Sequence, residues 1–337
     1  MFTYIVRRLL LLIPVLIGVS ILAFVIMRSA GDPTFAYLQN PDKVTPHQYQ
    51  LVREKYHLNE PLYIQYWYWL DGVFHGDLGF SRQAHENVTN AIAEKFPATF
   101  ELALISTFLS VVIGIFLGTI AAVRANSATD QGLRVLSLVA VSIPVFWLGL
   151  MLQMTFYPQW LPLQGRFDDQ LYSISTLHAH TGFLLIDTLL SGDFNFFLDV
   201  VKHLILPAIT LAFVSTALIL RMMRSSMLEV LGSEYVQTAR SKGLPERTVI
   251  RKHARRNALI PTTTVIGLSF GGLLGGAVLT ETVFGWQGLG QWSQEAATNL
   301  DTAGIMGFTL LTAMIYVLAN LFVDLIYAYL DPRVRLG

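Results

Sequence analysis

The chain has 337 residues, of which 53% are hydrophobic and 14% are charged, and its formal net charge at pH 7 is zero. Its length alone would allow roughly two or three soluble domains, but its uncharged stretches reach bilayer-spanning length, which excludes an ordinary soluble protein. The sequence contains no cysteine, which excludes disulfides and thiolate metal sites.

Six apolar segments are long enough, or nearly so, to cross a membrane. About 20 apolar residues at a rise of about 1.5 Å span a hydrocarbon core about 30 Å thick. The fourth segment is the shortest and carries Pro207 near its start, so its limits are the least defined. The sequence therefore predicts an all-α integral membrane protein with six transmembrane helices and sizeable external loops. The six segments are Leu9–Met27, Leu102–Val123, Val135–Phe156, His203–Leu220, Ala258–Thr280 and Thr302–Val323.

The first segment follows Arg7 and Arg8 and resembles the start of a secretory signal. Its 19 uncharged residues are long for a signal core, and no small-x-small cleavage site follows Met27, so we expect a retained helix. Placing the N-terminus in the cytoplasm puts 15 of the 23 Lys and Arg residues in short cytoplasmic segments. Positive residues favour that side, so we expect both termini to be cytoplasmic.

Three stretches are expected on the external side. The first, Arg28–Phe100, is predicted to form helical turns, and its aromatic run fits either a binding surface or, preferably, an interfacial belt of Trp and Tyr. The second, Tyr157–Lys202, is expected to form a partly ordered cap. The third, Glu281–Asp301, has three glycines and two tryptophans and predicts a tight re-entrant turn. The aromatic run comprises Tyr63, Tyr66, Trp67, Tyr68 and Trp69.

The fifth span is rich in glycine. Small residues let helices approach closely in lipid, so the pattern indicates tight packing, a helix that lines a path, or a dimer seam, and these alternatives stay open. The glycines are Gly267, Gly271, Gly272, Gly275 and Gly276.

Motifs for catalysis or nucleotide binding are missing from the sequence. It has neither a G-x-x-x-x-G-K-[ST] loop nor a G-x-S-x-G elbow, and the stretch at His85–Thr89 lacks the second histidine of a zinc protease. Ion-driven carriers usually keep charged residues inside their spans. Here Asp, Glu, Lys and Arg lie only at span ends, at Glu101, Arg221 and Asp324. We therefore expect the energy for transport to come from a partner.

A basic segment between the fourth and fifth spans holds nine of the 23 Lys and Arg residues. Ser225–Arg240 is predicted to continue the fourth span as one helix, and Gly243 to end it, because glycine tolerates the left-handed conformation. Pro245 and Glu246 suit the first turn of a second short helix. Two interpretations remain: a rigid element that docks on a partner, and a solvated loop set by the positive-inside rule alone. The basic residues are Arg221, Arg224, Arg240, Lys242, Arg247, Arg251, Lys252, Arg255 and Arg256.

Several motifs together favour the docking interpretation. The segment Thr238–Gly243, with Pro261 eighteen residues beyond the glycine, resembles the "EAA" loop of bacterial ABC-importer permeases, in particular the dipeptide/oligopeptide branch. The other segments that resemble this family span nearly the whole chain and are specific in combination. They are Met222–Leu231, His253–Pro261, Glu281–Gly290, His75–Ser81 and Asp331–Arg333.

The resemblance implies a type I ABC-importer permease fold in the plasma (inner) membrane of a prokaryote. It also implies a homologous second permease, two ATPase subunits that bind ATP and Mg, and an external substrate-binding protein, with no cofactor in this chain and no nucleic-acid partner. The implied organisation is a first transmembrane helix at 1–30, an external helical segment at 31–100, a five-helix core at 101–330 with a cytoplasmic coupling loop at 223–257, and a cytoplasmic tail at 331–337.

The resemblance also assigns roles to residues. In the alternating-access cycle that it implies, ATP binding moves the coupling helices inward and the path opens outward. One departure is Thr238, which stands where the family loop begins with Glu, and this puts any contact of that carboxylate in doubt. A Gly243→Val change is expected to cut transport and ATPase stimulation. The implied coupling residues are Glu234, Thr238, Ala239, Arg240, Lys242, Gly243 and Leu244. The candidates for the path or gate are Gly271, Gly275, Glu281, Trp286 and Gly288.

The expected substrates are di- or oligopeptides. Relatives within the same family carry nickel, glutathione or sugars, and the sequence does not separate these well. A different class, a self-sufficient channel or secondary carrier, is the competing hypothesis. Its signature would be uptake driven by ions through this chain alone.

Overall fold

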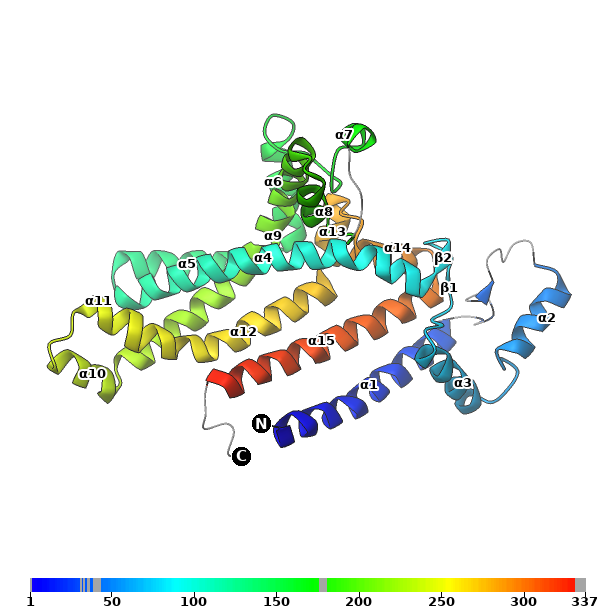
Figure 1. The fold of residues 1–337 in the computed structure, drawn as a ribbon, viewed down its shortest axis with the longest axis horizontal. Helices are drawn as coiled ribbons and strands as arrows, with labels where there is room; N and C mark the ends of the chain where they lie inside the picture. Colours follow the sequence, from blue (N-terminus) through cyan, green and yellow to red (C-terminus); the bar gives the residue numbers. More distant parts are fainter. Residues whose placement is uncertain are drawn as a thin grey trace.

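The computed structural model describes residues 2–30, 32, 34, 37, 38, 44–175 and 181–330. Within them the regular structure is helical apart from one short antiparallel hairpin of β1 (Phe80–Ser81) and β2 (Glu86–Asn87). Figure 1 shows long helices lying side by side, with α2 and α3 at one end and α10 and α11 at the other. The helices are α1 (Phe2–Ala30), α2 (Pro46–Lys55), α3 (Leu62–Phe74), α4 (Val88–Val123), α5 (Ala128–Ser142), α6 (Val145–Phe156), α7 (Asp169–Ile174), α8 (Leu184–Ser191), α9 (Phe194–Leu231), α10 (Glu234–Ser241), α11 (Glu246–Thr248), the π-helical turn η3 (Val249–Ala254), α12 (Arg255–Gly276), α13 (Val278–Phe284), α14 (Leu289–Thr298) and α15 (Thr302–Leu330).

The prediction of an all-α membrane protein is confirmed. Four helices in the described part of the chain are long and apolar enough to span a bilayer, and the α5–α6 pair gives a fifth if it counts as one span. The first predicted span corresponds to α1, whose shorter apolar stretch is Ile13–Ile26. The four long candidates are Val88–Val123, Phe194–Leu231, Glu246–Gly275 and Thr302–Val323.

The third predicted span, Val135–Phe156, is not one straight helix. The chain turns by 101° between α5 and α6. Pro144 lacks a backbone N–H and disfavours helical geometry in the residue before it. Ile143 accordingly has extended dihedrals, with φ of −80° and ψ of 126°, so the helix ends there and restarts after the proline.

Two other helices begin earlier in the chain than the predicted spans. Helix α4 has 36 residues and α9 has 38. The external stretches predicted as Arg28–Phe100 and Tyr157–Lys202 therefore end where these helices begin. Glu101, predicted at a span end, lies inside α4 and is 5% exposed.

Helices α4 and α9 lie against each other at two glycines of α4. A Cβ at Gly114 would lie 2.8 Å from Ile219, and one at Gly118 would lie 2.7 Å from Met223. Ile219 and Met223 are fully buried. The missing side chains thus permit the close backbone approach on which packing in lipid depends.

The glycines of the fifth span pack α12 against α15. A Cβ at Gly271 would lie 2.9 Å from Ala319, and one at Gly275 would lie 2.6 Å from Thr312. The packing alternative is confirmed for these two positions, whereas their role in a path or gate stays a prediction. Gly272 faces open space.

The aromatic run of α3 divides into two sets. Trp69 is 9% exposed and, with Tyr66, packs on Phe24 of α1 at ring-centroid distances of 5.7 and 5.4 Å. Tyr63 and Trp67 are 74% and 70% exposed. The run therefore anchors α3 with one face, and the interfacial belt stays a prediction for the other. The predicted motif Asp331–Arg333, the 331–337 tail and the side chain of Asp324 lie outside the described residues.

Candidate functional site

The coupling hairpin, residues 232–257, joins α9 to α12 at one end of the molecule (Figure 1). The predicted single helix from Ser225 to Arg240 is wrong, because α9 ends at Leu231 and α10 begins at Glu234. Ser233 is the N-cap of α10, with extended dihedrals, and its hydroxyl donates to the carbonyl of Val230 at 2.6 Å. Glycine followed by serine is the break signal that the prediction overlooked.

A small apolar cluster holds α10 to the rest of the chain. Val236 and Val249 are fully buried and Ala239 is 7% exposed, and they pack with Val230 and Leu231 at the end of α9. Since α10 has only eight residues, it would be marginal as an isolated helix. This cluster therefore determines where the exposed face of α10 points.

The turn after α10 depends on the backbone of Gly243. Its φ is +75°, and a Cβ there would meet no atom within 4 Å, so glycine is favoured by the backbone conformation and is not needed for space. Its N–H donates to the carbonyl of Arg240 at 2.9 Å. The prediction that Gly243 ends the helix is confirmed. Across the turn, the Arg240 guanidinium donates to both carboxylate oxygens of Glu246, at 2.7 and 3.1 Å.

Beyond the turn the chain runs without interruption into the fifth span. Helix α11, the π-helical turn η3 and α12 follow one another directly, and Glu246–Gly275 is one continuous helix. The expectation of a separate second short helix is therefore wrong. A π-helical turn inside a long helix often marks a functional position, and here it lies where the hairpin meets the span.

The exposed face of the coupling hairpin carries most of the predicted coupling residues. Ala239 is the exception, because it is buried inside this chain. Tyr235 is 45% exposed and its hydroxyl accepts a hydrogen bond from Asn257 at 2.8 Å. The exposed set combines basic side chains with two outward apolar groups, Tyr235 and Leu244. The exposed members of the predicted set are Glu234, Thr238, Arg240, Lys242, Gly243 and Leu244.

An ion pair that sequence reasoning missed lies near this end of α9. The Arg224 guanidinium binds the Asp130 carboxylate through two hydrogen bonds, of 2.5 and 2.8 Å. Asp130 is fully buried and also accepts from the N–H of Asn126 at 2.9 Å. The pair thereby ties the α4–α5 connection and α5 to α9, the helix that leads into the coupling hairpin. A sequence offers no signal for a pairing across 94 residues.

The second site is the turn at residues 277–291, which joins α13 to α14; it is called the external turn after the side on which it is predicted to lie. Glu281 is fully buried. One of its carboxylate oxygens accepts from the Thr99 hydroxyl at 2.7 Å, and the other accepts from the N–H groups of Gly290 and Gln291 at 2.8 and 3.1 Å. These N–H groups belong to the first turn of α14, where a carboxylate is stabilised by the helix N-terminus. Burial raises the pKa of Glu281, although these hydrogen bonds oppose the rise.

Trp286 and Gly288 belong to the same buried arrangement. Trp286 is fully buried and its indole N–H donates to the carbonyl of Ala98 in α4 at 2.9 Å. A Cβ at Gly288 would lie 2.5 Å from both Glu281 Oε2 and Thr99 Oγ1. The structure thus brings three of the predicted path or gate residues together around Thr99, and places Gly271 and Gly275 elsewhere, on the α12–α15 contact.

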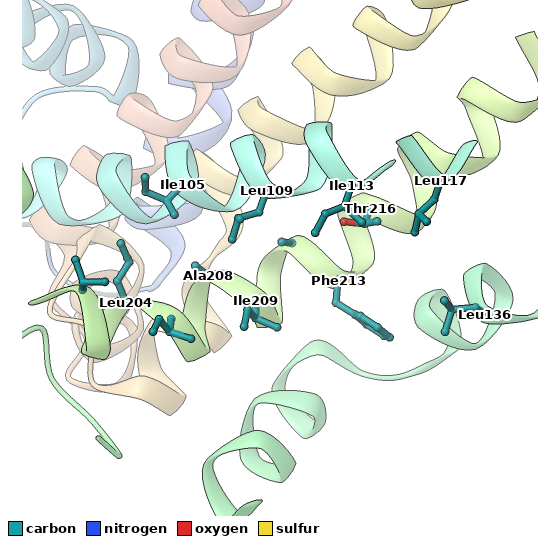
Figure 2. A pocket seen from close by; sticks show the side chains of 13 residues that line it. Ile105, Leu109, Ile113, Leu117, Leu136, Leu204, Ala208, Ile209, Phe213 and Thr216 are labelled. Carbon is teal, nitrogen blue, oxygen red and sulfur yellow. The ribbon is translucent and has the colours of Figure 1, made fainter. Parts of the chain in front are cut away.

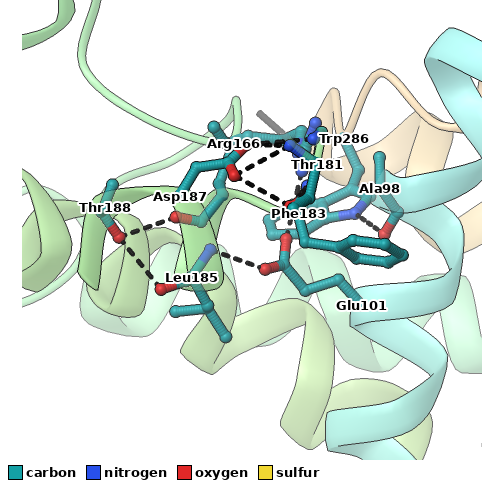
Figure 3. Close-up of polar contacts among 11 residues, drawn as sticks. Ala98, Glu101, Arg166, Thr181, Phe183, Leu185, Asp187, Thr188 and Trp286 are labelled. Atoms are coloured by element: carbon teal, nitrogen blue, oxygen red, sulfur yellow. Dashed lines mark hydrogen bonds and ion pairs between the residues drawn. The ribbon is translucent and has the colours of Figure 1, made fainter. Parts of the chain in front are cut away.

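A polar network extends from this turn to α8 (Figure 3). The Arg166 guanidinium binds the Glu101 carboxylate at 3.1 Å and lies over the Trp286 ring at 5.8 Å. The other Glu101 oxygen accepts from the N–H of Leu185 near the start of α8, at 2.8 Å. The network therefore joins α4, the loop before α7, and α8, which sequence reasoning had treated as separate parts.

An apolar groove of about 520 Å³ lies between α4, α9 and α5 (Figure 2). Ile105, Leu109, Ile209 and Phe213 are among the residues that line it, and Thr216 is the one polar side chain among its described lining residues. A peptide bond placed here would lose its hydrogen bonds to water with little replacement, which costs free energy. The groove therefore suits an apolar group better than a peptide backbone. Within the described ranges, no group of three His, Asp or Glu residues is placed to hold a metal ion.

Comparisons with known proteins cover nearly the whole chain. A family model described as "Binding-protein-dependent transport system inner membrane component" matches residues 114–336, and the N-terminal model of such membrane components matches residues 1–103. The di/tripeptide transport system permease protein DppB of Pseudomonas aeruginosa is 44% identical, over 99% of each chain. The dipeptide transport system permease protein DppB of Escherichia coli is 41% identical, over 99% of each chain. The oligopeptide transport system permease protein AppB of Bacillus subtilis is 38% identical, over 99% of this chain and all of the relative.

Proposed function

Because the chain belongs to the family of inner membrane components of binding-protein-dependent transport systems, we propose that it is the permease subunit of an ATP-driven importer of short peptides. The observation that carries the proposal is the coupling hairpin. It exposes Arg240, Lys242 and Leu244 in α10 and in the turn directly before the continuous helix Glu246–Gly275. An element of this kind can transmit a displacement from a docked partner into α9 and α12.

The proposed assembly adds a second, homologous permease, two ATPase subunits and an external substrate-binding protein. ATP and Mg are held by the ATPases, and this chain contributes no catalytic group. Both termini and the coupling hairpin face the cytoplasm, which is supported by the excess of basic residues in those segments. The external turn and α3 then face the binding protein's side.

The proposed substrates are di- and tripeptides. The support is full-length identity of 41–44% to permeases that are named for dipeptide or di/tripeptide transport. The apolar groove does not offer the hydrogen bonds that a peptide needs, so the path is proposed to form with the second permease. Nickel, glutathione and oligosaccharides remain the alternatives within the family.

Motion is proposed to pass along two routes from the coupling hairpin. One route is the continuous helix from Glu246 through α12, whose glycines pack on α15. The other is α9, which the Asp130–Arg224 ion pair ties to α5. The external turn acts as a fixed point, because Glu281 has a hydrogen-bond donor on both carboxylate oxygens.

The test is ATP-driven uptake by the assembled complex. The chain is co-expressed with its neighbouring permease and ATPases, purified, and reconstituted in liposomes with the binding protein and labelled L-alanyl-L-alanine. The expected result is uptake that needs ATP and persists when ionophores dissipate ion gradients. Uptake by this chain alone, driven by a proton or sodium gradient, would overturn the proposal.

A further inference from the structure

A small cleft lies at the end of the molecule opposite the coupling hairpin, where α1 ends beside α3 (Figure 1). This outer cleft has a volume of about 160 Å³ and is separate from the external turn and the apolar groove. None of the functions assigned above uses it. Its principal lining residues are Arg28, Tyr37, Tyr56, Gln65, Tyr68 and Asp77.

The walls of the outer cleft are stacked ring pairs. Tyr37 lies on Tyr56 with ring centroids 3.9 Å apart, and His57 lies on Tyr68 at 3.7 Å. Tyr37–Tyr56 joins the stretch before α2 to the end of α2, and His57–Tyr68 joins the connection after α2 to α3, so the walls are fixed by contacts between neighbouring segments. Aromatic rings supply apolar contact area at little cost in side-chain entropy, which suits a preformed small-molecule site.

Two polar atoms of the outer cleft are buried without a partner among the described residues. They are Oε1 of Gln65, an acceptor, and Nε of Arg28, a donor. Gln65 is 8% exposed, and its Nε2 donates to the carbonyls of Leu58 and Glu60 at 3.1 and 2.6 Å. Those two bonds fix the amide orientation, since the opposite one would set oxygen against oxygen. An unpaired buried polar atom destabilises the folded state, and a ligand that pairs with both atoms would relieve this destabilisation.

The charges around the outer cleft are of both signs. Arg28 and Lys55 contribute cations, and Asp71 and Asp77 contribute carboxylates. The Lys55 ammonium already lies over the Tyr56 ring at 5.1 Å. A ligand that carries one carboxylate and one ammonium matches this arrangement, whereas an ion of a single sign would meet a like charge.

We propose that the outer cleft binds small zwitterions of the amino-acid and dipeptide class. The ligand carboxylate accepts from the Arg28 guanidinium, its ammonium donates to Gln65 Oε1 and faces the carboxylate side of the cleft, and its aliphatic part contacts the stacked rings. The choice of a dipeptide as probe rests on the proposed function, but the site is a property of this chain alone and lies outside the proposed path.

The test measures binding by titration calorimetry with the full chain in lipid nanodiscs, without ATPases or binding protein. The probes are L-alanyl-L-alanine, its N-acetyl derivative and its N-acetyl amide. Loss of one charged contact is expected to weaken binding about tenfold or more, so the order of affinity is the zwitterion, then the N-acetyl acid, then the uncharged amide. Equal affinity for all three probes, or no binding of the zwitterion, would overturn the proposal.

Variants place the binding at the outer cleft. Arg28→Met is expected to abolish binding of L-alanyl-L-alanine, and Arg28→Lys, which keeps the charge but lacks Nε, to weaken it about tenfold. Arg82→Met is the matched control, because Arg82 lies outside the cleft and donates to the carbonyl of Leu300. Unchanged affinity in a folded Arg28→Met or Arg28→Lys chain would refute the assignment. If the wild-type chain in nanodiscs does not bind L-alanyl-L-alanine while the assembled complex still takes it up with ATP, the outer cleft is refuted and the proposed function stands.

Discussion

The coupling hairpin and the external turn are both glycine-containing bends that join helices. The polar groups of the external turn are buried and hydrogen-bonded, whereas those of the coupling hairpin are exposed. At the external turn, Glu281 is fully buried and each of its oxygens accepts at least one hydrogen bond. At the coupling hairpin, Lys242 and Leu244 point outward, and the Arg240–Glu246 pair is largely exposed. The polar groups of the external turn find their partners within this chain, whereas the coupling hairpin presents exposed groups that another protein can bind.

The glycines differ in the same way. Gly288 is required because a Cβ would lie 2.5 Å from two oxygens, and Gly243 is favoured only by its φ of +75° in open space. A substitution at the first therefore disturbs packing and stability. A substitution at Gly243 changes the direction of the chain without creating a clash. Its expected effect is on the proposed docking of a partner.

The largest expected effect is on stability, from Glu281→Ala. The change leaves the Thr99 hydroxyl and the N–H of Gly290 buried and unpaired, and the partly buried N–H of Gln291 loses its partner. At about 1 kcal/mol for each buried donor, the cost is about 2–3 kcal/mol. A lower thermal unfolding midpoint of the purified complex, followed by tryptophan fluorescence, checks this. Tyr63→Ala, at an exposed position of α3, is the control. A midpoint equal to the wild-type value would show that the external turn is not a fixed point.

The next effect comes from Gly288→Ala. The added methyl must displace Glu281 or Thr99, and overpacking of this kind costs about 1–3 kcal/mol. Gly272→Ala adds the same methyl to open space in α12 and is expected to leave the midpoint unchanged. Equal shifts of the unfolding midpoint in Gly288→Ala and Gly272→Ala would contradict the close packing at Gly288.

A smaller effect is expected from pH. Burial raises the pKa of Glu281 in the folded chain above its unfolded value of about 4.3, so the folded state binds the proton more tightly. The resulting contribution to stability is present at low pH and is lost as pH rises through the folded pKa. The midpoint of the wild-type complex, relative to Glu281→Gln, should therefore increase as pH falls from about 8 toward 5. A difference that stays constant with pH would contradict the raised pKa.

The smallest effect on stability is expected from Arg240→Gln at the coupling hairpin. Exposed ion pairs contribute less than about 1 kcal/mol, so the unfolding midpoint should hardly move. ATPase activity of the complex should fall clearly, because Arg240 belongs to the proposed docking face. A large loss of stability in Arg240→Gln with normal ATPase activity would contradict the view that the exposed groups of the coupling hairpin serve docking.

Much of the fold could be predicted from local sequence. The apolar segments identified the spans, and Gly243 identified the turn, because span length and left-handed glycine are properties of short stretches. The 101° turn at Ile143–Pro144 was missed although a proline signals it, because the apolar run continues across it. The break after Leu231 was missed for a similar reason, since the helical pattern outweighed the Gly–Ser pair.

The candidate site could be predicted only in part. Glu281, Trp286 and Gly288 stood out as residues, but their partner Thr99 is 182 residues away from Glu281, and nothing local indicates it. Asp130 and Arg224 pair across 94 residues. Ala239 was predicted at the docking face, whereas its burial depends on Val249 from beyond the turn. Pairing between distant segments is decided by packing, which a single sequence does not display.

The central claim is that the coupling hairpin transmits ATP-driven motion, and Gly243 tests it most directly. Gly243→Val places a β-branched residue at a φ of +75°, which is strained, while Gly243→Asn keeps a residue that tolerates this conformation. Dipeptide uptake and ATPase stimulation are measured in proteoliposomes together with the unfolding midpoint. The account predicts that Val abolishes uptake and stimulation, that Asn retains most of both, and that the midpoints of the two variants are similar. Full uptake in the Val variant would contradict it.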